Sequence, residues 1–261
     1  QATMGMAGPA LVKAGLGQEI DKEALGGAAL QTNRYGISDL AVDTEDEALA
    51  AVRRFLSYLP SNARQPLPIQ ENDDPITRAE EELLEIIPAS PRKSYDVRRI
   101  IELISDQGSV FEKKPSYARN IVTSFARLNG RPVGFVANQA RHLAGMLDVK
   151  ACEKASQFIG LCDAFGLPLV MLIDVPGFAI GSEAEKAGLG RRSGRLMFEM
   201  GQASVPRVSI VLRKGYGGGY YAMGGGSAFD NNATFAWPTA EICAMSVEGS
   251  VDVAYRKDFE A

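Results

Sequence analysis

The residues best suited to chemistry lie in a glycine-rich stretch, residues 213–226, which directly follows the apolar run 205–212. Glycine has no β-carbon, so it tolerates positive φ angles and lets a ligand or another helix approach the backbone N–H groups. Consecutive N–H groups at a strand-to-helix turn can stabilise negative charge that develops on a carbonyl oxygen. The stretch therefore predicts an oxyanion hole. Close helix packing is the alternative, and packing alone would explain residues 224–226.

Phosphate binding is a competing interpretation of the same glycines. The chain has no G-x-x-x-x-G-K-[ST] motif, which argues against a nucleotide triphosphatase loop. A dinucleotide fingerprint, G-x-G-x-x-A, fits Gly217, Gly219 and Ala222, and Glu241 follows at about the separation expected for a ribose contact. However, Trp237 and the proline after it interrupt the next strand, and the pattern lies late in its domain. A Rossmann-type NAD-dependent oxidoreductase remains an alternative.

Side chains of the usual nucleophile and base types are scarce. There is no G-x-S-x-G motif, and the single histidine, His142, lies in a loop-like segment. The cysteines, Cys152, Cys162 and Cys243, show no C-x-x-C spacing and lie in apolar segments, which predicts reduced thiols and no metal site. Catalysis by backbone donors suits a reaction whose substrates supply the base, so the sequence points away from hydrolysis.

Alternating strands and helices must position the glycine stretch. The expected elements are a helix over 95–104, an antiparallel hairpin of 120–128 and 131–137 joined by Asn129-Gly130, a helix over 148–165, a strand over 167–174, a helix over 182–202, a strand over 205–212, and short strands at 233–237 and 240–245. This order predicts an α/β fold with buried strands. Ligands gather beyond the carboxyl ends of such strands, where both the turn 174–178 and the glycine stretch should lie.

Two domains joined by a linker are expected. Residues 1–60 end in a helix over 44–59, which begins with a capping box of Thr44 and Glu47. Residues 61–91 are rich in proline and acidic residues, which is typical of a linker. Residues 92–261 form the second domain. The chain begins at Gln1 within a turn-rich motif and ends without a signal, so we expect a fragment cut at both ends.

Composition limits the classes of function. The net charge of −4 and the pI near 5.3 argue against a nucleic-acid surface, because phosphate contacts need clustered Lys and Arg. No stretch approaches the roughly 20 apolar residues that a membrane-spanning helix needs, and no signal peptide is visible. We therefore expect neither nucleic acid nor a membrane among the partners.

Seven motifs occur in order along the chain, at residues 118–122, 130–139, 162–168, 174–178, 205–208, 213–219 and 235–242. Together they closely resemble the carboxyl-terminal domain of biotin-dependent acyl-CoA carboxyltransferases, the β subunits of propionyl-, acetyl- and methylcrotonyl-CoA carboxylases and their decarboxylase relatives. Residues 1–60 resemble the tail of the family's amino-terminal domain, on the acyl-CoA side, and residues 92–261 resemble the domain on the biotin side.

The resemblance implies a crotonase-like (ClpP/crotonase) α/β fold, a superhelix of ββα units. It also implies transfer of a carboxyl group from carboxybiotin to the α-carbon of an acyl-CoA through an enolate. Gly218 and Gly219 would be the catalytic N–H donors to the ureido carbonyl of biotin, and Tyr221 would help select the acyl chain. The implied biotin-binding residues are Asp174, Val175, Pro176, Gly177, Phe178, Tyr216 and Gly217.

The resemblance further implies biotin carried by a partner, biotin carboxylase and biotin carboxyl carrier subunits, and a dimer-based hexamer. The active site would lie between domains of two subunits, in the bacterial cytoplasm or the mitochondrial matrix. A decarboxylase of malonyl-type CoA esters and a noncatalytic assembly subunit are the alternatives. Tyr221 stands where Asp or Ile is expected for propionyl or acetyl enzymes, Ala140 where proline is usual and Gly219 where alanine is common, so the acyl group stays open.

Overall fold

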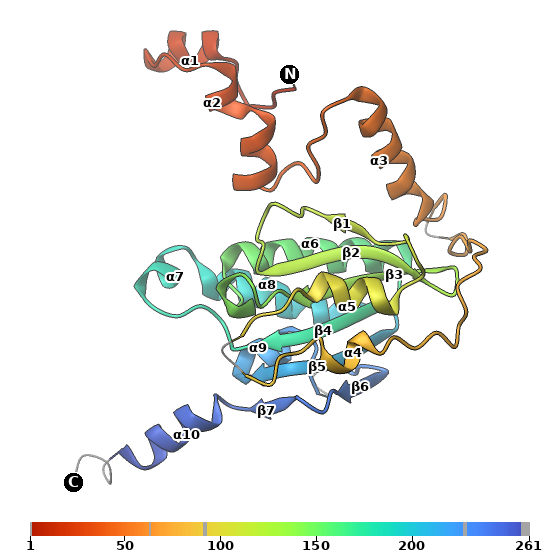
Figure 1. Ribbon diagram of the computed structural model, residues 1–261. Coiled ribbons are helices and arrows are strands. Elements are labelled where there is room, and N and C mark those ends of the chain that lie inside the picture. Colours follow the sequence, from red (N-terminus) through yellow and green to blue (C-terminus); the bar gives the residue numbers. More distant parts are fainter. Residues whose placement is uncertain (1, 63, 91–92, 227–228, 257–261) are drawn as a thin grey trace.

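A seven-stranded sheet forms the centre of the protein (Figure 1). The computed structural model describes residues 2–62, 64–90, 93–226 and 229–256. The sheet order is β1-β2-β3-β4-β5-β6, with β7 also pairing with β5. Its strands are β1 Phe111–Lys113, β2 Ile121–Leu128, β3 Arg131–Asn138, β4 Leu169–Val175, β5 Arg207–Tyr216, β6 Ala233–Ala236 and β7 Glu241–Cys243. Strands β1 to β3 pair antiparallel, and all later pairs are parallel.

The predicted hairpin is confirmed. β2 and β3 pair over their whole length, from Ile121 opposite Asn138 to Leu128 opposite Arg131. The turn residues Asn129 and Gly130 have φ angles of 51° and 76°, the positive values that a two-residue primed turn requires. Both turn N–H groups donate to the carboxylate of Asp106, at 2.8 and 2.7 Å, which fixes the turn against the end of α5.

Helices cover both faces of the sheet, as the α/β prediction requires. The helices that pack on it are α4 Glu82–Glu85, α5 Val97–Ile104, α6 Val149–Phe165 and α8 Leu189–Gln202. One apolar cluster joins α6 and α8 to side chains such as Met171 and Val211 of the sheet. A second cluster joins α5 to Leu172 and Leu212, which point to the opposite face. The alternation along β4 and β5 thus separates two cores.

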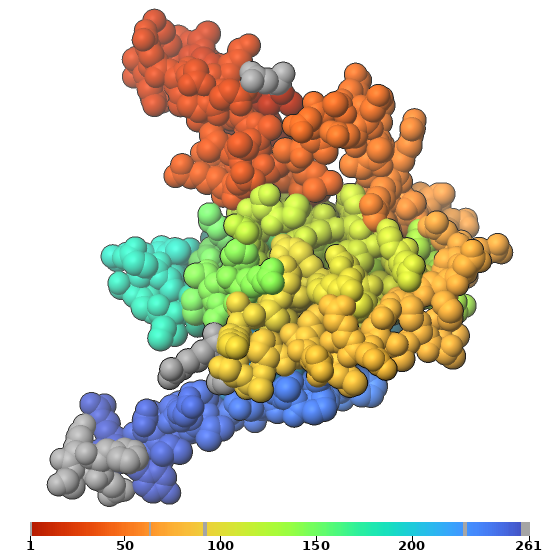
Figure 2. Space-filling view, viewed as in Figure 1, coloured from red at the N-terminus to blue at the C-terminus, as the bar shows by residue number. Residues whose placement is uncertain are grey.

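Residues 2–60 lie apart from the centre of the sheet (Figures 1 and 2). They contact its β1 edge through Asp39, which pairs with Lys113 at 2.7 Å, and through the carbonyl of Gly36, which accepts from Lys114. They contain α1 Pro9–Leu16, α2 Lys22–Gly26, a π-helix Leu30–Arg34 and α3 Glu45–Ser57. The predicted capping box of Thr44 and Glu47 is present. At the other end of α3, the ring of Tyr58 stacks on Phe125 with centroids 5.5 Å apart. This contact ties the amino-terminal segment to β2.

The segment that we expected to be a linker is mostly irregular and runs along the body of the protein. Arg78 donates to the backbone carbonyls of Leu103 and Ser105, at 2.8 and 2.6 Å, and pairs with Asp74. Residues 91 and 92, at the expected boundary, lie outside the described residues. The division into two domains stays a prediction.

Two predicted elements have different bounds in the structure. β5 continues to Tyr216, whereas the apolar pattern ended the strand at Leu212. The helix predicted over 182–202 is divided into α7 Ser182–Lys186 and α8, because Gly188 between them has φ 79°. The short helix α9 Gly217–Ala222 follows β5, and α10 Val247–Ala254 projects from the body after β7 (Figure 1). Among the described helices, none has the length and apolar character needed to cross a membrane.

Candidate active site

The two predicted ligand-binding segments meet at one edge of the sheet. β4 and β5 are parallel neighbours, and Val175 is paired with Gly215 near their carboxyl ends. The turn after β4 then contacts α9 so closely that a larger residue at Gly219 would require the backbone to shift: an added β-carbon would lie 2.9 Å from Cα of Gly177 and 3.0 Å from Val175. The prediction that both segments lie at the carboxyl ends of neighbouring strands is confirmed.

The first turn of α9 lies at this contact. Gly217, Gly218 and Gly219 form the first turn of α9, where N–H groups have no acceptor within the helix. The N-cap residue, Tyr216, makes no side-chain cap. Gly218 is exposed and Gly219 is buried. A β-carbon on Gly218 would lie 3.3 Å from the ring of Phe178, so a side chain at this position would crowd that ring.

The other glycines of the stretch allow close packing of the loop against its neighbours. Gly217 has φ 54°, and an added β-carbon would lie 2.8 Å from the carbonyl of Ala244. A β-carbon on Gly224 would lie 2.6 Å from Cε of Met200, and one on Gly225 would overlap the ring of Tyr220. These contacts agree with a packing role for residues 224–226.

The side chains of the predicted biotin-site residues are not all at the surface of the site. Pro176, Gly177 and Phe178 are partly exposed beside α9, whereas the carboxylate of Asp174 is fully buried and paired with Arg213. Tyr221 is 51% exposed, so its ring is available to a ligand. The structure thus brings the turn and the glycine helix together and places the Asp174 side chain beneath them.

Tyr216 connects the glycine helix to β7. Its hydroxyl donates to Glu241 at 2.5 Å, and burial, together with this bond, raises the pKa of Tyr216 above its usual range. Glu241 is the acidic residue that the dinucleotide alternative assigned to a ribose. Its carboxylate is used within the loop, because it accepts this hydrogen bond.

The two buried cysteines are not activated nucleophiles. Burial raises the pKa of the Cys152 thiol to about 12 and also raises that of Cys162. Burial and the nearby Arg119 lower the pKa of His142, which lies at a short 3₁₀ turn. The described part of the chain contains no group of three His, Cys, Asp or Glu arranged to hold a metal ion. Backbone donors remain the chemically distinctive feature.

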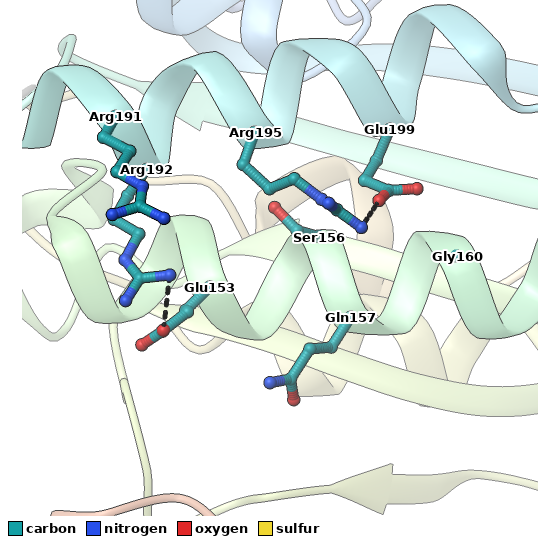
Figure 3. A pocket seen from close by; sticks show the side chains of 8 residues that line it. All are labelled: Glu153, Ser156, Gln157, Gly160, Arg191, Arg192, Arg195 and Glu199. Carbon is teal, nitrogen blue, oxygen red and sulfur yellow. Dashed lines mark ion pairs between the residues drawn. The ribbon is translucent and has the colours of Figure 1, made fainter.

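A cavity of about 420 Å³ lies between α6 and α8 (Figure 3). Its arginines are partly neutralised by carboxylates. Arg192 of α8 pairs with Glu153 of α6 at 3.0 Å, whereas Arg195 pairs with Glu199 one turn further along α8 itself. Glu199 also accepts a hydrogen bond from Gln202 of α8 at 2.6 Å. Only the pair of Arg192 and Glu153 connects the two helices, and the cavity contains none of the residues predicted for the site.

Two functional candidates were missed by sequence reasoning. Arg213 looks like the charged residue after a strand, yet it is buried and pairs with Asp174. Lys154 is 2% exposed, although it looks like a residue of the polar face of α6. Its ammonium donates to the carbonyls of Lys114, Tyr117 and Ile121, at 2.8 to 2.9 Å. Neither partnership has a local sequence signal, because the partners are 33 or more residues away.

Comparison with known proteins gives one consistent answer. The sequence matches the family described as Carboxyl transferase domain over residues 1–261, so the chain belongs to this family. It is 41% identical over 259 residues to the propionyl-CoA carboxylase, carboxyltransferase subunit, of Haloferax mediterranei. That alignment covers 99% of this chain and 50% of the relative. It is 38% identical over 255 residues to the methylmalonyl-CoA decarboxylase subunit alpha of Veillonella parvula, with 98% and 50% covered.

A solved structure agrees with both relatives. Transcarboxylase 12S, determined as a hexamer with methylmalonyl-coenzyme A and methylmalonic acid bound, superposes with a TM-score of 0.94 at 39% identity, covering all of this chain and 50% of that one. The predicted crotonase-like α/β fold is confirmed by this likeness. The chain spans about half the length of the relatives it matches. Family membership decides against the dinucleotide alternative.

Proposed function

We propose that the protein containing this chain transfers a carboxyl group from carboxybiotin to the α-carbon of an acyl-CoA. The single observation that carries the proposal is the contact between the turn after β4 and the first turn of α9, in which Gly218 lies beside Phe178 and Gly219 lies against Gly177. Membership of the carboxyl transferase family supports the same chemistry.

The site fits the ureido group of biotin. A neutral carbonyl needs hydrogen-bond donors and an open approach. The first turn of α9 supplies N–H donors, and Gly218 is exposed there. When bound, carboxybiotin would supply the carboxyl group that the α-carbon of the acyl-CoA gains, and the ureido nitrogen that loses this group could accept the α-proton. Gly218 and Gly219 would hold its ureido carbonyl.

The chain's own residues stabilise charge and exclude water. Gly218 and Gly219 donate to the oxygen on which negative charge develops, and each such donor lowers a barrier by about 2.7 to 4 kcal/mol in comparable sites. Phe178 and the buried Val175 cover one side of these donors, which keeps water from the group they bind. No side-chain base is needed, because the substrate pair moves its own proton.

Acyl-group selection is assigned to Tyr221. Its phenol ring is half-exposed and lies 5.7 Å from the ring of Tyr220, on the same short helix as the donors. We assign residues 92–261 to the biotin side and residues 1–60 to the acyl-CoA side. The acyl-CoA oxyanion hole would then belong to sequence that the longer relatives have and this chain does not contain.

The expected partners follow from the same proposal. They are a biotin carboxyl carrier, a biotin carboxylase and further copies of the subunit in a dimer-based hexamer; the hexamer of transcarboxylase 12S supports the last of these. The three free cysteines, two of them buried, support a reducing compartment such as the bacterial cytoplasm or the mitochondrial matrix.

A decarboxylase is the second candidate, since the relative from Veillonella parvula is 38% identical and bears that name. The same glycine donors would then work in the reverse direction, moving a carboxyl group from a malonyl-type CoA ester to biotin. Both candidates use one site, so the direction depends on the partners.

Transfer of label tests the proposal. Purified protein would be incubated with carboxybiotin labelled in its carboxyl group and, separately, acetyl-, propionyl- or methylcrotonyl-CoA. Labelled carboxyacyl-CoA is expected with at least one acceptor. Label that passes only from methylmalonyl-CoA to biotin would support the decarboxylase, and no transfer in either direction would overturn the proposal in favour of a noncatalytic assembly subunit.

A further inference from the structure

A buried ion pair lies directly beneath the two segments of the site. Asp174 is the penultimate residue of β4. Its carboxylate is fully buried and accepts a hydrogen bond from Nη2 of Arg213 at 3.0 Å. The same carboxylate accepts the backbone N–H of Lys214 at 3.0 Å. It therefore holds β5 by both a side chain and the main chain, just before the strand leads into α9.

The arginine is held equally firmly on its other side. Its Nη1 donates to the carbonyl of Lys93 at 2.8 Å, and its guanidinium lies 5.2 Å from the ring centroid of Tyr95. The backbone N–H of Asp174, in turn, donates to Asn138 of β3 at 3.2 Å. Contacts from β3, β4, β5 and the segment before α5 thus meet at one pair.

An irregularity in β5 creates this meeting. Ile173 pairs with Val211 and Val175 pairs with Gly215, so one residue of β4, Asp174, stands opposite three residues of β5, 212–214. Val211 packs on the α6 and α8 side and Leu212 on the α5 side, and regular alternation would send Arg213 back to the α6 and α8 side. The bulge instead turns Arg213 toward Asp174; bulges beside active sites commonly redirect a side chain in this way.

Such a pair suits a positioning role better than a role in overall stability. Because buried charges lose their hydration, replacing a buried ion pair by well-packed apolar residues often leaves a protein at least as stable. The geometry of a bidentate arginine–carboxylate pair, in contrast, is specific. Asp174 immediately precedes the turn with Gly177 and Phe178, and Arg213 lies four residues before Gly217. A shift of the pair would move both walls of the site relative to each other.

We propose that Asp174 and Arg213 are positioning residues that fix the distance between the turn 175–178 and the donor N–H groups of Gly218 and Gly219. They touch neither substrate nor cofactor and act through the backbone. The consequence for turnover rests on the proposed function; the consequence for loop order does not.

The test removes both charges together, so that neither is left buried alone. In the double variant Asp174→Asn, Arg213→Gln, turnover in the carboxyl-transfer assay is expected to fall by about 100-fold, the loss typical of an ångström-scale misplacement. The KM for acyl-CoA is expected to stay within about twofold, because the pair does not touch that substrate. Hydrogen–deuterium exchange should become faster in peptides covering 175–181 and 214–222 and stay unchanged in α6.

A matched control is available in the pair of Arg98 and Glu112, which is also bidentate, at 2.7 and 2.8 Å, and joins α5 to β1. The double variant Arg98→Gln, Glu112→Gln should leave turnover and the exchange of both site peptides unchanged. The variant Arg213→Lys keeps the charge but loses the planar fork and the stacking on Tyr95. It should show an intermediate loss, and it decides the question by the same readouts if the double variant does not fold.

The outcomes separate the two proposals. Unchanged exchange and unchanged turnover in a folded variant would overturn the positioning role. Faster exchange of both peptides in a protein whose parent form transfers no carboxyl group would support the positioning role and overturn the proposed function. Equal losses in the Arg98 and Glu112 control would reduce the effect to general destabilisation and also overturn the inference.

Discussion

Replacing Gly218 by valine is expected to stop carboxyl transfer and leave the fold intact. Backbone strain is not the reason, because the positive φ belongs to Gly217 and not to Gly218. The added β-carbon would lie 3.3 Å from Cε2 of Phe178, a contact that a small movement of the ring can relieve. The two γ-methyl groups would then occupy the exposed space beside the donor N–H groups.

The size of the effect follows from the donors that the methyl groups would cover. Loss of one oxyanion-hole donor costs about 2.7 to 4 kcal/mol of barrier, which is a factor of about 10² to 10³ in kcat. The free energy of unfolding should change little, because Gly218 is exposed at the start of a helix. In a helix, valine is more favourable than glycine by a few tenths of a kcal/mol.

The assay is transfer of labelled carboxyl from carboxybiotin to the best acyl-CoA, with thermal unfolding measured on the same samples. Gly194→Ala is the matched control, since nothing lies within 4 Å of an added β-carbon at that position of α8. The control should keep full activity. A Gly218→Val enzyme that is folded and retains more than half of its kcat would refute the role of these N–H groups.

Three further predictions concern other residues. Tyr221→Ile or Tyr221→Asp should change the ratio of kcat/KM between acetyl- and propionyl-CoA by about tenfold, the value of one or two methylene contacts; an unchanged ratio would remove Tyr221 from the acyl pocket. Tyr216→Phe, which deletes the 2.5 Å bond to Glu241, should lower the free energy of unfolding by about 1.5 kcal/mol in urea titrations, and a loss below the error of the titration would mean that the bond contributes nothing to stability. Burial lowers the pKa of Lys154 to about 7 from 10.5. Between these pH values the unfolded chain therefore binds more protons than the folded protein. The free energy of unfolding of the parent, relative to that of Lys154→Met, should rise by up to about 1.4 kcal/mol per pH unit from pH 7 to 9. A difference that stays flat with pH would show that the three carbonyl acceptors keep Lys154 charged.

Local signals were enough to predict much of the fold. Asn129 and Gly130 specify their own turn, because positive φ is a property of the two residues themselves. The caps at Thr44 and Asp148 are likewise satisfied by N–H groups three residues away. The alternation of helices and buried strands then placed the two turns at one edge of the sheet, which is the essential geometry of the site.

Long-range pairing explains what the sequence could not predict. The hydrophobic pattern ended β5 at Leu212, because Arg213 and Lys214 resemble the start of a solvated loop. In the structure the strand continues, since Asp174 neutralises the arginine and accepts the N–H of Lys214. The bulge that makes this possible depends on the register with β4, 39 residues away in sequence. The burial of the Asp174 side chain beneath the site could not be predicted from the sequence for the same reason, because it depends on this long-range pairing.

The break at Gly188 shows a different limit. The sequence predicts one helix with interior glycines over residues 182–202. The structure gives Gly188 a φ of 79° and starts α8 immediately after it. Glycine permits this conformation but does not require it, so the sequence alone could not choose between a continuous and a broken helix.

The central claim, that Gly218 and Gly219 bind the ureido carbonyl, is tested most directly by nuclear magnetic resonance of glycine-¹⁵N-labelled protein. The two amide signals would be assigned by their loss in Gly218→Ala and Gly219→Ala. Saturating biotin should move both signals downfield, as hydrogen bonding to a carbonyl does, whereas 2-iminobiotin, which lacks the ureido oxygen, should leave them in place. Unmoved signals with bound biotin, or equal shifts with 2-iminobiotin, would contradict the account.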